Sequence, residues 1–197
     1  MDAKAMTDQV ERVRARIGKR PIVLVGLMGA GKTSVGRRLA QLLDMPFADS
    51  DHEIESVSRM SVPELFEAYG ETEFRALEQR VVTRLVTGSP AVIATGGGAY
   101  MNADTRAVIR AHAVSVWLNA DLDTLMERVS RRSNRPLLKA ADPRAVMRKL
   151  IADRYPIYAE ADIAIVSRDA RHAVIAGEII DAIEQTILAE NEKDEIH

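Results

Sequence analysis

The sequence contains no cysteine, and this absence excludes disulfide bonds, thiolate metal sites and a cysteine nucleophile. The formal net charge at pH 7 is −2, so no overall positive charge would attract nucleic acid or an anionic membrane surface. No apolar run approaches the roughly 20 residues that a helix needs to cross a bilayer. We therefore expect a cytoplasmic protein that has neither nucleic acid nor a membrane as its partner.

The two ends of the chain and the histidines offer little chemistry. Residues 1–20 include acidic side chains and lack the apolar stretch of a secretory signal, so we expect a flexible or helical extension there. Residues 191–197 are typical of a polar tail. No ligand spacing relates the histidines to one another, which argues against a metal site other than one for Mg²⁺. These histidines are His52, His112, His172 and His197.

What the sequence does contain is a regular alternation of short β-branched runs with longer helical patterns, at 47% hydrophobic and 28% charged residues. Such strands, nearly continuous in apolar residues and separated by helices, indicate a parallel sheet covered on both faces. We therefore expect an α/β fold with a five-stranded parallel sheet, in a single domain over residues 21–190. The expected strand segments are 21–26, 45–51, 90–98, 112–120 and 161–167, with a helix from about Lys32 to Leu43.

Two insertions interrupt this alternation at the edge of the sheet where ligands bind, beyond the carboxyl ends of the strands. Residues 52–88 form a helical region longer than one crossover needs, and we expect it to bind the acceptor. Residues 128–143 are very basic and are broken by Pro136 and Pro143, which favours a closing lid. The alternative for this second insertion is an ordinary solvated loop.

The stretch "GLMGAGKTS" begins at Gly26, directly after the first expected strand, and runs into the first expected helix. It fits the pattern G-x-x-x-x-G-K-[ST] with Gly31, Lys32 and Thr33 in register. Glycines allow a tight loop whose backbone N–H groups converge on phosphate oxygens, and the helix dipole favours the same anion. Lysine can reach the β- and γ-phosphates, and the threonine hydroxyl can bind Mg²⁺. The alternative is a chance glycine-rich turn.

Two carboxylates follow the second expected strand. Asp49 and Asp51 are two residues apart, so in a strand they project to the same side. One could orient the waters of a magnesium ion while the other accepts a proton from a substrate hydroxyl. The alternative is an Asx-turn or a helix cap, in which Asp51 or Ser50 caps a helix that begins near His52. The spacing of the two carboxylates favours neither interpretation over the other.

Arginines and glycines supply a second candidate group. Arg75 and Glu78 are three apart on an expected helix, which is typical of a surface pair but also of a guanidinium held rigid to bind a carboxylate. Arg154 offers a second guanidinium of the same kind. Residues 96–98 are three consecutive glycines, each costing about 0.5–1 kcal/mol relative to alanine. They indicate that something approaches this backbone closely, although a tight turn or helix packing would account for one of them.

These motifs occur in an order that makes the sequence similar to the shikimate kinases, over nearly everything from Pro21 to Ala189. The resemblance implies a P-loop kinase that transfers the γ-phosphate of ATP to the 3-hydroxyl of shikimate, in aromatic amino-acid biosynthesis. It implies one Mg²⁺ per subunit, a monomer, and ATP and shikimate as small-molecule partners. The matching stretches are "GLMGAGKTS", "DSD" at 49–51, "SVPELFEAYGETEFRALE" at 61–78, "GGG" at 96–98, "RPLL" at 135–138 and "DRYPIY" at 153–158.

The resemblance also implies a role for each matching residue. Thr33 would ligate Mg²⁺, and Asp49 would support the ion through water. The residues that would bind ATP are Gly29, Ala30, Gly31, Lys32, Thr33, Ser34, Arg135 and Arg171, the last on the adenine side. Those that would bind shikimate are Asp51, Arg75, Gly97, Gly98 and Arg154. Those that would take part in catalysis are Lys32, Asp51 and Arg135, with Asp51 either a base or a group that orients the hydroxyl.

Two rival interpretations compete with a shikimate kinase. Another small-molecule P-loop kinase, for gluconate or a nucleoside monophosphate, would share the phosphate loop and the lid without needing the arginines and glycines above. A nucleotide-dependent regulatory module would need no acceptor at all. The strand at 92–95 lacks the terminal aspartate of a typical Walker B motif, so Asp49 alone would support magnesium.

Overall fold

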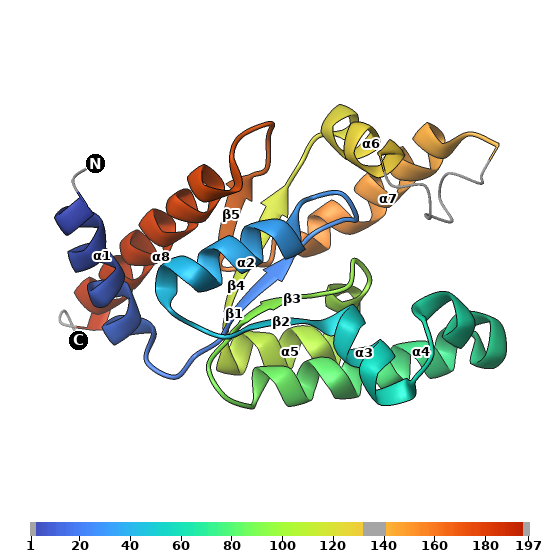
Figure 1. Ribbon diagram of the computed structural model, residues 1–197, viewed down its shortest axis with the longest axis horizontal. Helices are drawn as coiled ribbons and strands as arrows, with labels where there is room; N and C mark the ends of the chain where they lie inside the picture. The colour runs from blue at the N-terminus through green and yellow to red at the C-terminus, as the bar shows by residue number, and fades with distance from the viewer. Residues whose placement is uncertain (1–2, 132–140, 195–197) are drawn as a thin grey trace.

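The computed structural model describes residues 3–131 and 141–194. Its centre is one five-stranded sheet in the order β2-β3-β1-β4-β5, and every paired strand is parallel (Figure 1). This confirms the expected α/β architecture, and all five strands fall within the expected segments. Their bounds are β1 Ile22–Val25, β2 Phe47–Asp49, β3 Val92–Ala94, β4 Val114–Asn119 and β5 Ile163–Val166.

The central strand explains why the sheet is parallel and enclosed. All four residues of β1 are fully buried, because helices cover both of its faces. Leu24 pairs with Ala94 of β3 on one side and with Val116 of β4 on the other. The carboxyl ends of β1, β2 and β3 therefore meet at one edge, from which the loops that carry the motifs emerge.

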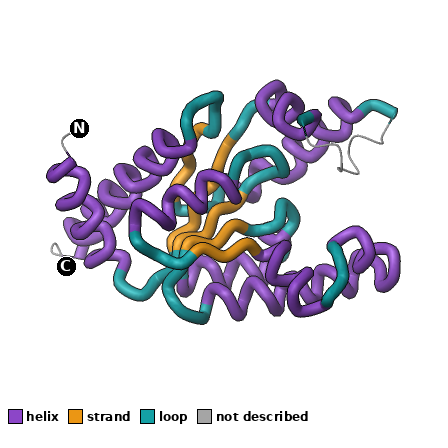
Figure 2. The backbone as a smooth tube through the Cα atoms, viewed as in Figure 1, coloured by secondary structure: helices purple, strands orange, loops and turns teal. Residues whose placement is uncertain are grey.

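Helices enclose the sheet in two layers (Figure 2). Helices α1, α2 and α8 pack together on one face of the sheet. On the other face α4 contacts α5, which lies against β4. Helix α7 contacts η1. The bounds are α1 Ala3–Ile17, α2 Lys32–Leu43, α3 Ser50–Ser58, α4 Val62–Val86, η1 Ala99–Met101, α5 Ala103–His112, α6 Leu122–Ser130, α7 Pro143–Tyr158 and α8 His172–Asp194. None of the helices in the described ranges is long and apolar enough to span a membrane.

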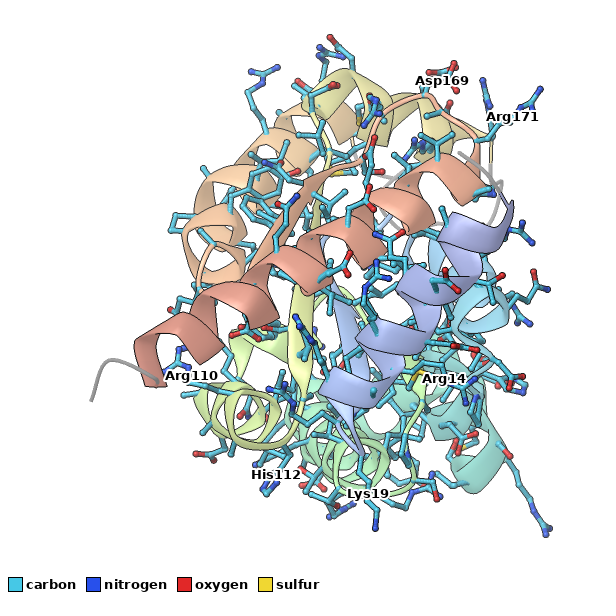
Figure 3. The ribbon with its side chains drawn as sticks, turned by 90° about the vertical axis from the view of Figure 1, so that its left-hand side faces the viewer. Arg14, Lys19, Arg110, His112, Asp169 and Arg171 are labelled. Carbon is cyan, nitrogen blue, oxygen red and sulfur yellow. The ribbon has the colours of Figure 1, made fainter. Side chains whose placement is uncertain are left out.

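The N-terminal segment is a helix that joins the core. Val13 is 0% exposed and Ile17 is also buried, so α1 presents an apolar face to the rest of the fold. Gln9 donates from Nε2 to Asp181 Oδ1 at 2.7 Å, which ties α1 to α8, the helix beside it in Figure 3. Two arginines of α1 form ion pairs at its surface, Arg12 with Glu184 at 2.8 Å and Arg14 with Asp44 at 3.3 Å.

Helices α3 and α4 form the helical region expected between the second and third strands. Apolar side chains from the two helices make a small separate core of Ile54, Leu65, Phe74 and Val81. Ser61 begins α4 with a capping box, since its hydroxyl accepts from Glu64 N while the Glu64 carboxylate accepts from Ser61 N. A kink at Gly70, with φ of 77°, divides the helix. This small core holds α4 beside the ligand edge of the sheet.

The expected lid falls largely on residues 132–140, which lie outside the described residues, and Arg135 and Pro136 are among them. Before this segment, α6 ends at Ser130. After it, Asp142 caps α7, and its side chain accepts a hydrogen bond from Ala145 N at 2.9 Å. The roles expected for the lid and for Arg135 therefore remain predictions.

Candidate active site

The phosphate loop has the geometry that its glycines predict. Gly26 has φ of 139°, and a Cβ there would lie 2.8 Å from the carbonyl oxygen of Leu118, so only glycine fits. Gly31 precedes α2 with φ of 92°, and no side chain caps the first turn of this helix. The first N–H groups of α2 thus have no capping side chain and carry the positive end of the helix dipole. This is an anion-binding site made of backbone.

Lys32 lies back across this loop. Its Nζ donates to the carbonyl oxygens of Gly26 at 2.7 Å and Leu27 at 2.9 Å. The ammonium group is therefore held over the loop on which phosphates would rest.

Thr33 and Asp49 meet beside the loop. The Thr33 hydroxyl donates to Asp49 Oδ2 at 2.8 Å. The other oxygen, Oδ1, caps α3 by accepting from Asp51 N at 3.1 Å and His52 N at 3.5 Å. The alternative of a cap by Asp51 or Ser50 is wrong, because α3 begins earlier, at Ser50, and Asp49 is its cap. One carboxylate thus fixes α3 and at the same time faces the phosphate loop.

A cavity of about 430 Å³ joins the phosphate loop to the ends of β2 and β3. Of the predicted site residues, it is lined by Gly29, Gly31, Lys32, Thr33, Ser34, Asp49, Asp51 and Gly97. Within the described ranges, Ala30, Arg75, Gly98, Arg154 and Arg171 do not line it. Other lining residues include Gly96, Arg128, Ser167, Ala170 and His172.

Arg75 and Glu78 form a partly buried pair and not a surface pair. Arg75 Nη1 lies 2.6 Å from Glu78 Oε2, and the Glu78 side chain is only 4% exposed. Burial raises the pKa of Glu78, while the guanidinium groups of Arg75 and Arg154 act in the opposite direction. The Arg75 guanidinium also lies 5.2 Å from the ring centre of Phe74. It is thereby held in place and remains 31% exposed, so part of it stays available to a ligand.

The triple glycine has a physical reason that the sequence did not reveal. A Cβ on Gly96 would lie 2.6 Å from Asp51 Oδ1 and 2.8 Å from Glu78 Oε1. A Cβ on Gly98 would lie 2.6 Å from Arg75 Cζ. These two glycines make room for the side chains of the site itself, and their φ values are not in the left-handed region.

Gly97 differs from its two neighbours. A Cβ there would have ordinary contacts, the nearest at 3.5 Å to Met28 N. The space beside Gly97 is therefore not filled by the side chains of the site, and a close approach by a substrate to Gly97 and to the backbone of Gly98 stays a prediction.

Helix α7 reaches the same glycines from the other side. Arg154 donates from Nη1 to the Gly97 carbonyl oxygen at 2.9 Å, and the Tyr158 hydroxyl donates to the same oxygen. The Ser50 hydroxyl, buried in α3, accepts from Gly96 N at 2.9 Å. Sequence reasoning missed Tyr158 and Ser50, although the i, i+4 spacing of Arg154 and Tyr158 placed them on one helix face.

Arg128 links the phosphate loop to the turn that precedes α8. Its Nη1 donates to the Gly29 carbonyl at 3.2 Å and to Ser167 Oγ at 2.9 Å, and its Nη2 donates to the Arg168 carbonyl at 2.7 Å. Ser167 in turn donates to the carbonyl of Ala30 at 2.8 Å. These contacts were not predicted, because they join segments far apart in the sequence.

Arg171, predicted to lie on the adenine side, is exposed beside Asp169 at the end of the molecule away from Lys19 and His112 (Figure 3). Its neighbours Ala170 and His172 line the cavity, although Arg171 itself does not.

The phosphate loop lies at the carboxyl edge of the parallel sheet and opens into a cavity. Two aspartates line the same cavity, and a partly buried guanidinium lies nearby. This arrangement defines a P-loop kinase that acts on a small molecule. The sequence model of the shikimate kinase family matches residues 28–184. The chain therefore belongs to the shikimate kinase family.

Individual relatives agree with this family. The chain is 62% identical to a shikimate kinase of Mesorhizobium japonicum over 168 residues, 85% of this chain and 83% of the relative. It is 58% identical to one of Brucella canis over 175 residues, 89% of this chain and 88% of the relative. Phosphorylation of the 3-hydroxyl of shikimate by ATP, a step of aromatic amino-acid biosynthesis, is thus the activity of this chain.

Solved structures give the same result. Shikimate kinase from Acinetobacter baumannii in complex with shikimate superposes with a TM-score of 0.83 at 38% identity, covering 88% of this chain and 97% of that one. A gluconokinase from Sinorhizobium meliloti has a TM-score of 0.55 at 18% identity, covering 91% and 98%, and so shares the fold alone. The family match and the relatives therefore favour a shikimate kinase over the two rival interpretations, a kinase for another small molecule and a regulatory module.

Proposed function

We propose that the cavity binds the ATP phosphates on the loop 26–33 and shikimate against Asp51 and residues 96–98, with the 3-hydroxyl facing the γ-phosphate. The observation that carries this proposal is that one cavity is lined by the phosphate loop, by Asp51 and by Gly97. Phosphoryl transfer requires little covalent chemistry from a protein, so alignment and charge neutralisation are its main tasks. The described residues are suited to both tasks.

The Thr33–Asp49 pair fits a magnesium ion. A hydroxyl and a carboxylate oxygen 2.8 Å apart are hard ligands of the kind that Mg²⁺ prefers. Among the described residues there is no cluster of three or more His, Cys, Asp or Glu that could hold a metal. This suits an ion that protein oxygens and substrate phosphates hold together, with Thr33 as a direct ligand and Asp49 acting through water. When bound, Mg²⁺ neutralises charge on the phosphates.

Lys32 and the backbone provide the remaining positive charge around the phosphates. The Lys32 ammonium exchanges the carbonyls of Gly26 and Leu27 for phosphate oxygens, and the first N–H groups of α2 donate to the same anion. Asp51 accepts the hydrogen bond of the 3-hydroxyl and orients it. It either takes the proton late in the reaction or leaves it to solvent. Arg135 keeps its predicted place beside the transferring phosphate.

The carboxylate of shikimate is assigned to Arg75 and Arg154. Planar guanidinium groups bind carboxylates in two-point geometry, which fixes orientation as well as position. Glu78 supports this by holding Arg75 Nη1 from beneath, at 2.6 Å. The monomeric state stays a prediction. The cytoplasmic location stays a prediction.

The test is a measurement of ATP consumption with different acceptors. We expect turnover with shikimate, and only a low background with gluconate, with nucleoside monophosphates or without an acceptor. Equal ATP consumption with and without shikimate would contradict the proposal, as would a preference for gluconate. Omission of Mg²⁺ should abolish the shikimate-dependent rate.

A further inference from the structure

The Gly97 carbonyl is the meeting point of two donors from α7. Arg154 Nη1 donates to it at 2.9 Å, and the Tyr158 hydroxyl donates to it as well. The two side chains are four residues apart in the last turn of the helix, so they lie on one face. One of these donors is assigned to the shikimate carboxylate, whereas the other has no role in the proposed reaction.

Tyr158 is the more rigid of the two donors. It is 0% exposed, and the centre of its ring lies 6.3 Å from that of Tyr100 and 6.2 Å from that of Trp117. Burial raises the pKa of Tyr158 to about 12, so the hydroxyl stays protonated and remains a donor at any pH at which the enzyme works. Arg154 is only partly buried, on a long side chain that can turn toward a ligand.

We propose that Tyr158 is a positioning residue for the acceptor, which holds the Gly97–Gly98 peptide in place when Arg154 turns from the Gly97 carbonyl to the shikimate carboxylate. This inference rests on the proposed function. A peptide unit is planar and trans, so the Gly97 C=O and the Gly98 N–H point in opposite directions. Fixing the carbonyl therefore aims the Gly98 N–H. No hydrogen bond among the described residues uses that N–H.

The shared carbonyl couples the two side chains energetically. In the native protein, the Gly97 oxygen keeps one hydrogen bond from Tyr158 after Arg154 has turned away. Without the tyrosine hydroxyl, Arg154 would be the remaining donor, and its release would leave the carbonyl unpaired. Binding of shikimate would then have to overcome this cost, whereas binding of ATP would not.

The experiment compares Tyr158→Phe with a matched control, Tyr155→Phe. Tyr155 belongs to the same helix, and its hydroxyl donates to the Ala120 carbonyl, away from the glycines. Both variants keep the ring and lose one O–H···O=C bond. For Tyr158→Phe we expect the KM for shikimate to rise about tenfold, equivalent to about 1.4 kcal/mol, while the KM for ATP stays within about twofold. Tyr155→Phe should leave both KM values near those of the native enzyme.

Two results would overturn the inference. One is a native shikimate KM in Tyr158→Phe. The other is a nonspecific effect, in which Tyr158→Phe raises the KM values for shikimate and ATP equally or Tyr155→Phe raises the shikimate KM as much as Tyr158→Phe does.

Arg154→Lys separates this inference from the proposed function. If that variant leaves the shikimate KM unchanged, the assignment of the carboxylate to Arg154 fails. If it raises the KM while Tyr158→Phe does not, only the role of Tyr158 fails.

A measurement on the native enzyme keeps the inference testable should Tyr158→Phe not fold. The amide resonance of Gly98 should shift on saturation with shikimate, because its N–H is aimed at the acceptor. Gly177, which is in α8 and is not among the residues that line the cavity, provides the reference resonance. A Gly98 resonance that moves no more than that of Gly177 would contradict the proposed orientation of the peptide.

Discussion

Replacing Gly98 by alanine would test whether the space beside this glycine belongs to Arg75. A Cβ at this position would lie 2.6 Å from Arg75 Cζ, which is too close for any real contact, so the guanidinium must move. The backbone itself accepts alanine, since φ is −99° and ψ is −16°. The whole effect of the substitution should therefore come from the displaced Arg75.

The structure sets the size of two effects. Moving Arg75 weakens its 2.6 Å contact with the buried Glu78, which we expect to cost about 1–2 kcal/mol and to lower Tm by about 2–8 °C. It also removes one charge-assisted contact to the shikimate carboxylate, worth about 1.5–3 kcal/mol, so the KM for shikimate should rise about 10- to 150-fold. The KM for ATP should stay near the native value, because Arg75 does not line the cavity beside the phosphate loop.

Steady-state kinetics with each substrate varied, together with thermal melts, would measure both effects. Gly177→Ala serves as the control, because a Cβ there meets nothing within 4 Å. An unchanged shikimate KM in a folded Gly98→Ala enzyme would refute the assignment of Arg75 to the acceptor.

Two further predictions concern charge. Lys32→Ala should lower kcat about 100-fold or more with any acceptor, because it removes a cation from the developing phosphate charge; near-native turnover would contradict this role. Glu78 should make stability depend on pH. Its pKa is raised by burial above 4.5, so its contribution to stability is complete below that value and is lost as the pH rises through the folded-state pKa. In thermal melts between about pH 4 and 7, Glu78→Gln should therefore lose less stability with rising pH than the native enzyme does. A variant whose stability follows pH in the same way as that of the native enzyme would contradict this prediction.

Local patterns predicted the sheet and the phosphate loop well. The expected helix from Lys32 to Leu43 has those same bounds, because a glycine loop before it and Asp44 in the left-handed conformation after it define both ends. The strands were recognisable because each is a short apolar run buried between helices. The alternative cap of α3, by Asp51 or Ser50, was one or two positions too late, which is within the usual uncertainty of a helix boundary.

Contacts between segments far apart in the chain could not be predicted from the sequence. Glu78 could be paired with Arg75 from helical spacing, but its burial depends on how α4 packs beside Asp51 and Gly96. The Tyr158 hydroxyl reaches Gly97 only because α7 packs against η1, the turn that directly follows the three glycines. The glycines showed that space was needed, without showing that Asp51, Glu78 and Arg75 are what fill it.

A crystal structure with shikimate and a non-hydrolysable ATP analogue would test the central claim most directly. We predict the γ-phosphate over Lys32, the 3-hydroxyl within hydrogen-bond distance of Asp51 and in line with that phosphate, and the carboxylate between Arg75 and Arg154. A shikimate carboxylate bound away from both arginines, or a hydroxyl that faces away from the phosphate, would contradict the account.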